Sequence, residues 1–79
     1  MNIDQQTYNA LLRFQRNEIT ESIVYTKLAA VEKNPANRDV LLRISADEKG
    51  HYAVLKKYTE QDVAPFKWKI LKYYLLARH

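Results

Sequence analysis

Glu48 and His51 are the residues of this sequence best placed to do chemistry. They form a Glu-x-x-His pair within Asp47-Glu48-Lys49-Gly50-His51. On a helix, residues three apart lie on one face, about one turn from each other. The pair can therefore offer an oxygen and a nitrogen ligand to one metal cluster. Because such pairs also arise by chance, a metal site requires a further ligand at the same height.

Glu18 is the expected further ligand. Asn34 and Pro35 have the pattern of a helix N-cap followed by proline in the first turn. This break predicts two long helices, about residues 5–33 and 35–59, that fold back as an antiparallel hairpin. At about 1.5 Å per residue, Glu18 lies about 24 Å before the bend and Glu48 about 21 Å after it. Glu18, Glu48 and His51 should therefore converge and act through a bound metal.

The helical faces also favour a metal over a hydrophobic core. Glu18 falls in the middle of the apolar face of the first helix, with Arg16, Thr20 and Lys27 opposite it. Glu48 and His51 fall on the apolar face of the second helix. A carboxylate on such a face costs free energy unless it is paired, protonated or bound to metal. A single glutamate or histidine is usually structural, so the prediction rests on the three together.

Two other positions add to this pattern. Glu21 lies one turn from Glu18 at the edge of the apolar face and is a candidate to support the site. Gly50 lies inside the second helix, where it costs about 1 kcal/mol relative to alanine. A neighbouring backbone that approaches closely would explain a glycine there.

Length and composition limit how the chain can be stabilised. Its 79 residues include no cysteine, one glycine and two prolines. A disulfide or cysteine-ligated metal is excluded, and long helices without strands are expected, so we predict a single all-α domain. So small a core is marginal, which favours oligomerisation or metal binding.

The end of the chain predicts a short third helix, about residues 66–78. It is apolar nearly all round, with Lys67, Lys69, Lys72 and Arg78 at intervals. Such a helix must pack on the hairpin, on another chain or on a membrane surface. We expect no nucleic-acid binding, because the net charge of +4 is diffuse and the aromatic residues are expected to belong to the core.

Three ligands are too few for a closed site. Ferritin-like di-metal sites use a glutamate from each of two helices and a Glu-x-x-His pair from each of two others. A two-fold homodimer would supply that set and bury the exposed face of the hairpin. We therefore expect a homodimer, or a larger even-numbered oligomer, that forms a four-helix bundle around two metal ions. Oxygen ligands with imidazole favour iron, with manganese and zinc as the alternatives.

The sequence resembles the first half of a rubrerythrin-type domain of the ferritin-like superfamily. The residues that carry this resemblance are Leu12-x-Phe14-Gln15-x-x-Glu18-Ile19-x-Glu21, Tyr25, Leu28-Ala29, Asp47-Glu48-x-x-His51 and Leu55-Lys56. The resemblance implies that Glu18, Glu48 and His51 bind iron. It also implies that Tyr25 hydrogen-bonds a ligand carboxylate and that Asp47 orients a histidine of the other half-site. The half-length encapsulated ferritins, which complete their site by dimerising, are similar in ligand spacing.

The resemblance implies oxidation of Fe(II) by dioxygen or peroxide, the chemistry of a ferroxidase or a peroxide-scavenging oxidoreductase. The alternative is a non-catalytic helical module that docks on a membrane protein or a protein shell through residues 66–79. The sequence has no signal-peptide pattern and no apolar run that approaches the length of a membrane span. A cytoplasmic location is therefore expected.

Overall fold

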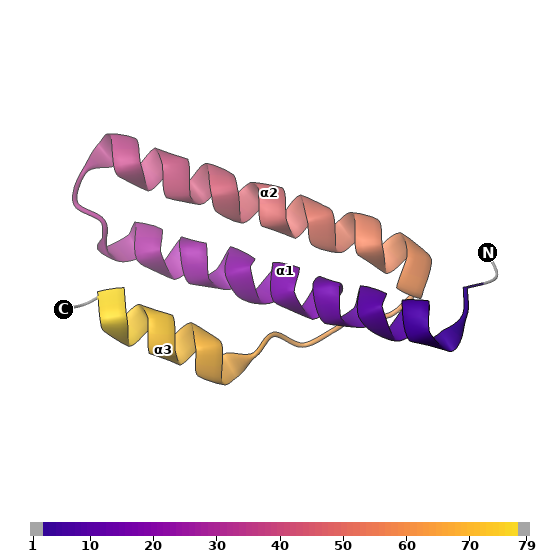
Figure 1. Ribbon diagram of the computed structural model, residues 1–79. Helices are drawn as coiled ribbons and strands as arrows, with labels where there is room; N and C mark the ends of the chain where they lie inside the picture. Colours follow the sequence, from indigo (N-terminus) through magenta and orange to yellow (C-terminus); the bar gives the residue numbers. More distant parts are fainter. Residues whose placement is uncertain (1–2, 78–79) are drawn as a thin grey trace.

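The computed structural model describes residues 3–77, which form three helices joined by two short connections (Figure 1). The helices are α1 (Gln5–Val31), α2 (Pro35–Thr59) and α3 (Lys67–Ala77). They comprise 84% of the described residues, and this part of the chain has no strand. The predicted all-α class is confirmed.

Side chains cap the start of both helices of the hairpin, and the second cap lies at the bend. The Asp4 carboxylate accepts a hydrogen bond from the Thr7 amide at the start of α1, and Asn34 does the same for Asn37 at the start of α2. These caps satisfy amides that have no partner within the helix. Pro35 occupies the first turn of α2, where a missing amide hydrogen costs nothing.

α1 ends two residues earlier than the predicted boundary at residue 33. Glu32 adopts an extended conformation, and its carbonyl oxygen accepts hydrogen bonds from the Arg38 guanidinium at 2.9 and 3.2 Å. Its side chain also accepts from the Asn34 amide. These contacts hold the chain out of the helix before Asn34. α3 begins one residue later than predicted, and its predicted end at residue 78 lies outside the described residues.

The three helices lie side by side in one flat layer, with α1 between α2 and α3 (Figure 1). The Cα positions extend over 47 × 23 × 14 Å, so the molecule is long in one direction and thin in another. α2 and α3 make no direct contact with each other. Both broad faces of the layer are therefore open.

The interior of this layer is small and largely polar. The buried side chains between residues 3 and 77 are Gln15, Thr20, Ser22, Val24, Ala29, Ser45 and Thr59. The side chains of Ser22, Ser45 and Thr26 hydrogen-bond one another across α1 and α2, and Ser22 and Ser45 also bond each other's backbone carbonyl. Small hydroxyl residues let the two helices approach closely, but they bury little apolar surface.

The connection between α2 and α3 is held against α1 by a second polar cluster. Gln15 is fully buried; its amide donates to the Gln61 carbonyl at 2.6 Å and accepts from the Thr59 hydroxyl at 2.6 Å. The Tyr8 hydroxyl donates to the Thr59 carbonyl. This cluster directs the chain back along α1, so that α3 can pack on the side away from α2.

α3 packs on the side of α1 that the helical wheel placed opposite the apolar face. The Arg16 guanidinium lies 3.7 Å from the centroid of the Phe66 ring, and the Lys27 ammonium lies 5.5 Å from that of Tyr74. The buried Thr20 hydroxyl accepts a hydrogen bond from the Phe66 amide. Aromatic rings pack well on cationic side chains, so α1 has contacts on two opposite sides rather than one.

Candidate metal centre

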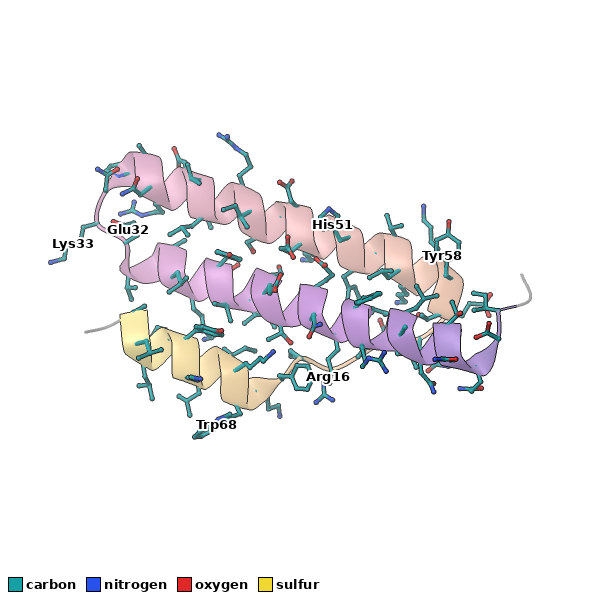
Figure 2. All side chains as sticks on the ribbon, viewed as in Figure 1. Arg16, Glu32, Lys33, His51, Tyr58 and Trp68 are labelled. Atoms are coloured by element: carbon teal, nitrogen blue, oxygen red, sulfur yellow. The ribbon has the colours of Figure 1, made fainter. Side chains whose placement is uncertain are left out.

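Glu18, Glu48 and His51 come together midway along the hairpin. One ligand atom from each lies within 4.8 Å of the others. His51 Nδ1 is 3.2 Å from Glu18 Oε2 and 3.8 Å from Glu48 Oε1. The predicted match in height across the bend is therefore present, because the capped turn at Asn34 sets the register of α2 against α1. Figure 2 shows His51 at the middle of α2.

The cluster lies at the surface of the layer rather than in its interior. The side chains of Glu18 and Glu48 are 23% and 17% exposed, and that of His51 is 62% exposed. The expectation of an inward-facing histidine is wrong for the single chain, because a layer one helix thick has no interior beyond the α1–α2 contact. His51 instead faces out from one broad side.

Glu21 also belongs to this group of carboxylates. Hydrogen bonding with Glu48 raises the pKa of Glu21; partial burial adds to the shift and the Lys69 ammonium opposes it. Hydrogen bonding with Glu18 raises the pKa of Glu48, and partial burial again adds to the shift, while Glu21 and the charge of His51 oppose it. Three carboxyl groups thus crowd one side of the hairpin, where a cation would relieve their repulsion.

From its spacing alone, Glu21 was expected only to support the site. Glu21 lies three residues after Glu18 and therefore on the same stripe of α1. This spacing is the feature of the sequence that indicates its contact with Glu48. The α3 residue Lys69, whose charge acts on Glu21, could not be assigned from spacing alone. Its position depends on how the connection between α2 and α3 folds.

Within the single chain Tyr25 does not make the contact that the resemblance implies, and the role implied for Asp47 concerns a histidine of a second half-site. Tyr25 borders a groove of about 390 Å³ between α1 and α3, together with Glu21 and Lys69. Among residues 3–77 it has no hydrogen bond to Glu18 or Glu48. Asp47 is exposed on α2, and within the same part of the chain it has no hydrogen bond to His51. Their proposed roles depend on groups from outside this chain.

The donor set fits a transition-metal ion. Two ligand atoms bound to one ion at about 2.1 Å lie about 3.0 Å apart in neighbouring positions and about 4.2 Å apart in opposite ones. The two distances from His51 Nδ1, 3.2 and 3.8 Å, fall in this range. Two carboxylates and an imidazole suit iron, manganese or zinc.

The broad face that holds the cluster, which we call the open face, also has apolar side chains at alternating spacings of four and three. On α1 the stripe consists of Phe14, Glu18, Glu21, Tyr25 and Leu28, and on α2 of Val40, Ile44, Asp47, His51, Val54 and Tyr58. The contact between Glu18 and His51 places both stripes on the same side of the layer. Phe14, Val40, Val54 and Tyr58 are each about half exposed. This spacing is typical of helices that pack against further helices.

Comparison with known proteins gives no relative for this chain. No known family, curated protein or solved structure matches it. Within residues 3–77, no helix has the length and apolar character needed to cross a lipid bilayer. The functional conclusion therefore depends on the residues of the cluster and on the face where they lie.

Proposed function

We propose that this chain forms a homodimer that holds two iron ions and oxidises Fe(II) with dioxygen or peroxide. The observation that carries the proposal is the convergence of Glu18, Glu48 and His51 within 4.8 Å of one another on an open helical face. The resemblance to rubrerythrin-type domains of the ferritin-like superfamily supports the same conclusion.

The open face supports completion of the site by a second copy. One chain offers too few ligands for a di-metal site. Two copies together offer four glutamates and two histidines, which is the full expected set. A two-fold axis through the open face would bring both sets together and bury the apolar stripes of α1 and α2. The product would be a four-helix bundle with the metal ligands at its centre.

Each residue of the site has a distinct task in this proposal. Glu18 and Glu48 would supply oxygen ligands to the metal, and His51 would supply a nitrogen ligand. Asp47 lies four residues before His51 on the same stripe of α2, where it could orient the histidine of a second copy. Tyr25 is proposed to hydrogen-bond a ligand carboxylate once the dimer forms.

The reaction itself needs little more from the chain. Bound iron would supply the redox chemistry, since Fe(II) is oxidised as dioxygen or peroxide is reduced. Because the sequence lacks cysteine, the electrons would come from Fe(II) or from an external donor. The task of the residues is to hold an oxygen-rich ligand set and to exclude bulk water once the open face is covered.

Titration with Fe(II) tests this function. Anaerobic protein is loaded with Fe(II) and exposed to air, and the near-ultraviolet absorbance of ferric carboxylate species is followed beside Fe(II) consumption. We expect saturation at one iron per chain. Glu48→Gln should abolish the signal, whereas Glu60→Gln, the same change at an exposed position outside the cluster, should leave it intact. No binding, or equal binding by both variants, would contradict the proposal.

A further inference from the structure

The outer edge of α3 is the second apolar surface of the molecule. Trp68, Leu71 and Leu75 follow the spacing i, i+3, i+7, which places them on one helical face. Trp68 is 74% exposed, and the other two are nearly half exposed. Figure 2 shows the Trp68 side chain directed away from α1 and α2. These three residues, which we call the α3 stripe, lie at the edge of the layer and not on the open face.

The charges of α3 are all of one sign. Lys67–Ala77 contains Lys67, Lys69 and Lys72 and no acidic residue. At about 100° per residue, Lys67 lies about 40° to one side of Leu71, and Lys72 lies about 40° beyond Trp68. The α3 stripe is therefore flanked by an ammonium group on either side. Lys69 is separate from this arrangement, since its ammonium lies 5.3 Å from the centroid of the Phe66 ring.

We propose that the α3 stripe binds the surface of an anionic phospholipid membrane. A short helix can lie in the plane of the headgroups, with its apolar side chains inserted and its charged side chains raised toward phosphate. Long lysine side chains on both flanks of a stripe are suited to this, because their apolar stems follow the insertion while their ammonium groups stay in water. Tryptophan favours the same interfacial depth.

The same features argue against two other occupants. Pairing of α3 with α3 of a second copy would bring Lys67 and Lys72 against like charges with no acidic residue to compensate. A protein partner seated on α3 alone would cover a footprint of only about 16 × 10 Å. A stable protein interface buries about 800 Å² on each side. A lipid surface needs no such area, since each inserted side chain contributes independently.

Membrane binding through α3 does not interfere with the open face. α3 contacts α1 and not α2, and its stripe points outward in the plane of the layer. A dimer formed through the stripes of α1 and α2 would leave the α3 stripes exposed. The inference therefore stands whether or not the chain binds metal.

Trp68 is the only tryptophan, so its fluorescence reports directly on the proposed insertion. The full chain is mixed with vesicles of phosphatidylcholine plus phosphatidylglycerol, and separately with vesicles of phosphatidylcholine alone. We expect the emission to shift to shorter wavelength only with the anionic vesicles, and to be quenched when their acyl chains are brominated. High salt should weaken the binding, because lysines attract the surface electrostatically.

Two variants and one matched control separate the contributions. Lys67→Glu with Lys72→Glu should lower vesicle partitioning at least about 30-fold, since each basic residue near an anionic surface contributes about fivefold. Leu71→Gln with Leu75→Gln should lower it at least about tenfold, because less apolar surface inserts. Lys33→Glu with Lys57→Glu has the same net charge as the first variant, and both lysines are exposed elsewhere. This control should retain most of the binding.

Several outcomes would overturn the inference. Wild-type emission that does not shift on anionic vesicles, or is not quenched by brominated chains, rules out insertion without reference to any variant. If the Lys33 and Lys57 control lost as much vesicle binding as the first variant, net charge alone would explain the effect. A shift produced equally by a soluble acidic polypeptide would indicate an acidic protein partner instead. Circular dichroism of each variant establishes that its helices are retained.

Discussion

Glu48 lies between two other carboxyl groups, and this position links stability to function. Both Glu18 and burial raise the pKa of Glu48, so the folded chain disfavours its ionised form. The stabilisation linked to protonated Glu48 is present below the pKa of the unfolded chain and is lost as the pH rises through the higher folded pKa. At neutral pH the metal-free site therefore opposes folding, and a cation bound there removes the opposition.

Replacing Glu48 by glutamine should separate these two effects. In metal-free protein at pH 7, Glu48→Gln should raise the free energy of unfolding, because the variant has no carboxylate to desolvate beside Glu18. The decrease in stability between about pH 4 and pH 7 should also be smaller than in the wild type. Urea denaturation at both pH values measures this.

The same variant should bind metal poorly. Loss of an outer hydrogen-bond partner costs a metal site about 10- to 100-fold in affinity, so loss of a ligand should cost more than about 100-fold. Glu60→Gln should change neither the pH profile nor the affinity. A Glu48→Gln protein less stable than the wild type at pH 7 would show that the ionised group is favourably paired.

Gly50 has no structural reason to be glycine in the single chain. The position has helical geometry with negative φ, and a Cβ added there would meet no atom within 4 Å beyond its own neighbours and the nearby backbone of its own helix. The close approach of a neighbouring backbone that would explain the glycine is therefore absent among residues 3–77. An alanine should fit without strain.

Gly50→Ala should raise the free energy of unfolding of metal-free protein by about 1 kcal/mol, the difference in helix propensity. Urea denaturation of dilute protein measures the change. If the substitution stabilises dilute protein but weakens the metal-loaded oligomer, a second copy packs against Gly50. A destabilised variant under both conditions would contradict the open surroundings of this residue.

The helices differ in how far sequence could predict them. The bend and the start of α2 follow from Asn34 and Pro35, because caps act locally. The match in height between Glu18 and His51 follows from the helical rise per residue on either side of that bend. The position of α3 could not be predicted, since it depends on the polar cluster around Gln15 and on the contact of the Phe66 ring with Arg16. Such contacts leave no periodic pattern in the sequence.

Gln15 should be the most sensitive polar position outside the metal cluster. Gln15→Ala removes the partner of both the Thr59 hydroxyl and the Gln61 carbonyl, which lie in a part-buried setting. Leaving buried polar groups unpaired costs about 1 to 3 kcal/mol. Thermal and urea unfolding should show this loss, whereas Gln6→Ala, at an exposed position of the same helix, should change stability by less than about 0.5 kcal/mol. Equal effects would show that the cluster does not anchor the connection.

The flat shape of the molecule is the feature that sequence predicted least well. Helical wheels identified apolar faces, but they assigned Glu18, Glu48 and His51 to an interior that a single layer does not provide. Val24 and Ala29 are the buried apolar residues of the described chain, so its own core is minimal. Part of the apolar periodicity of α1 and α2 instead appears on the open face, where Phe14, Val40, Val54 and Tyr58 are each about half exposed.

Val54 and Leu42 allow a direct test of that partner. Val54 lies three residues from His51 and belongs to the open face, whereas Leu42 lies nine residues from His51, half a turn away, on the opposite broad face. The two side chains are similarly exposed, at 51% and 45%. A lysine at either position changes the charge of the molecule equally, so only the face differs.

If the dimer forms through the open face, Val54→Lys should bring a charge into its interface and convert the protein to a monomer. Light scattering after gel filtration measures the mass, and metal analysis of the same fractions measures iron per chain. We expect wild type and Leu42→Lys to be even-numbered oligomers with one iron per chain. The Val54→Lys monomer should retain Glu18, Glu48 and His51 yet bind iron at least about tenfold more weakly, because ligands from the second copy are missing.

A monomeric wild type that binds iron fully would show that one chain suffices, and loss of the oligomer in Leu42→Lys alone would place the interface on the other face.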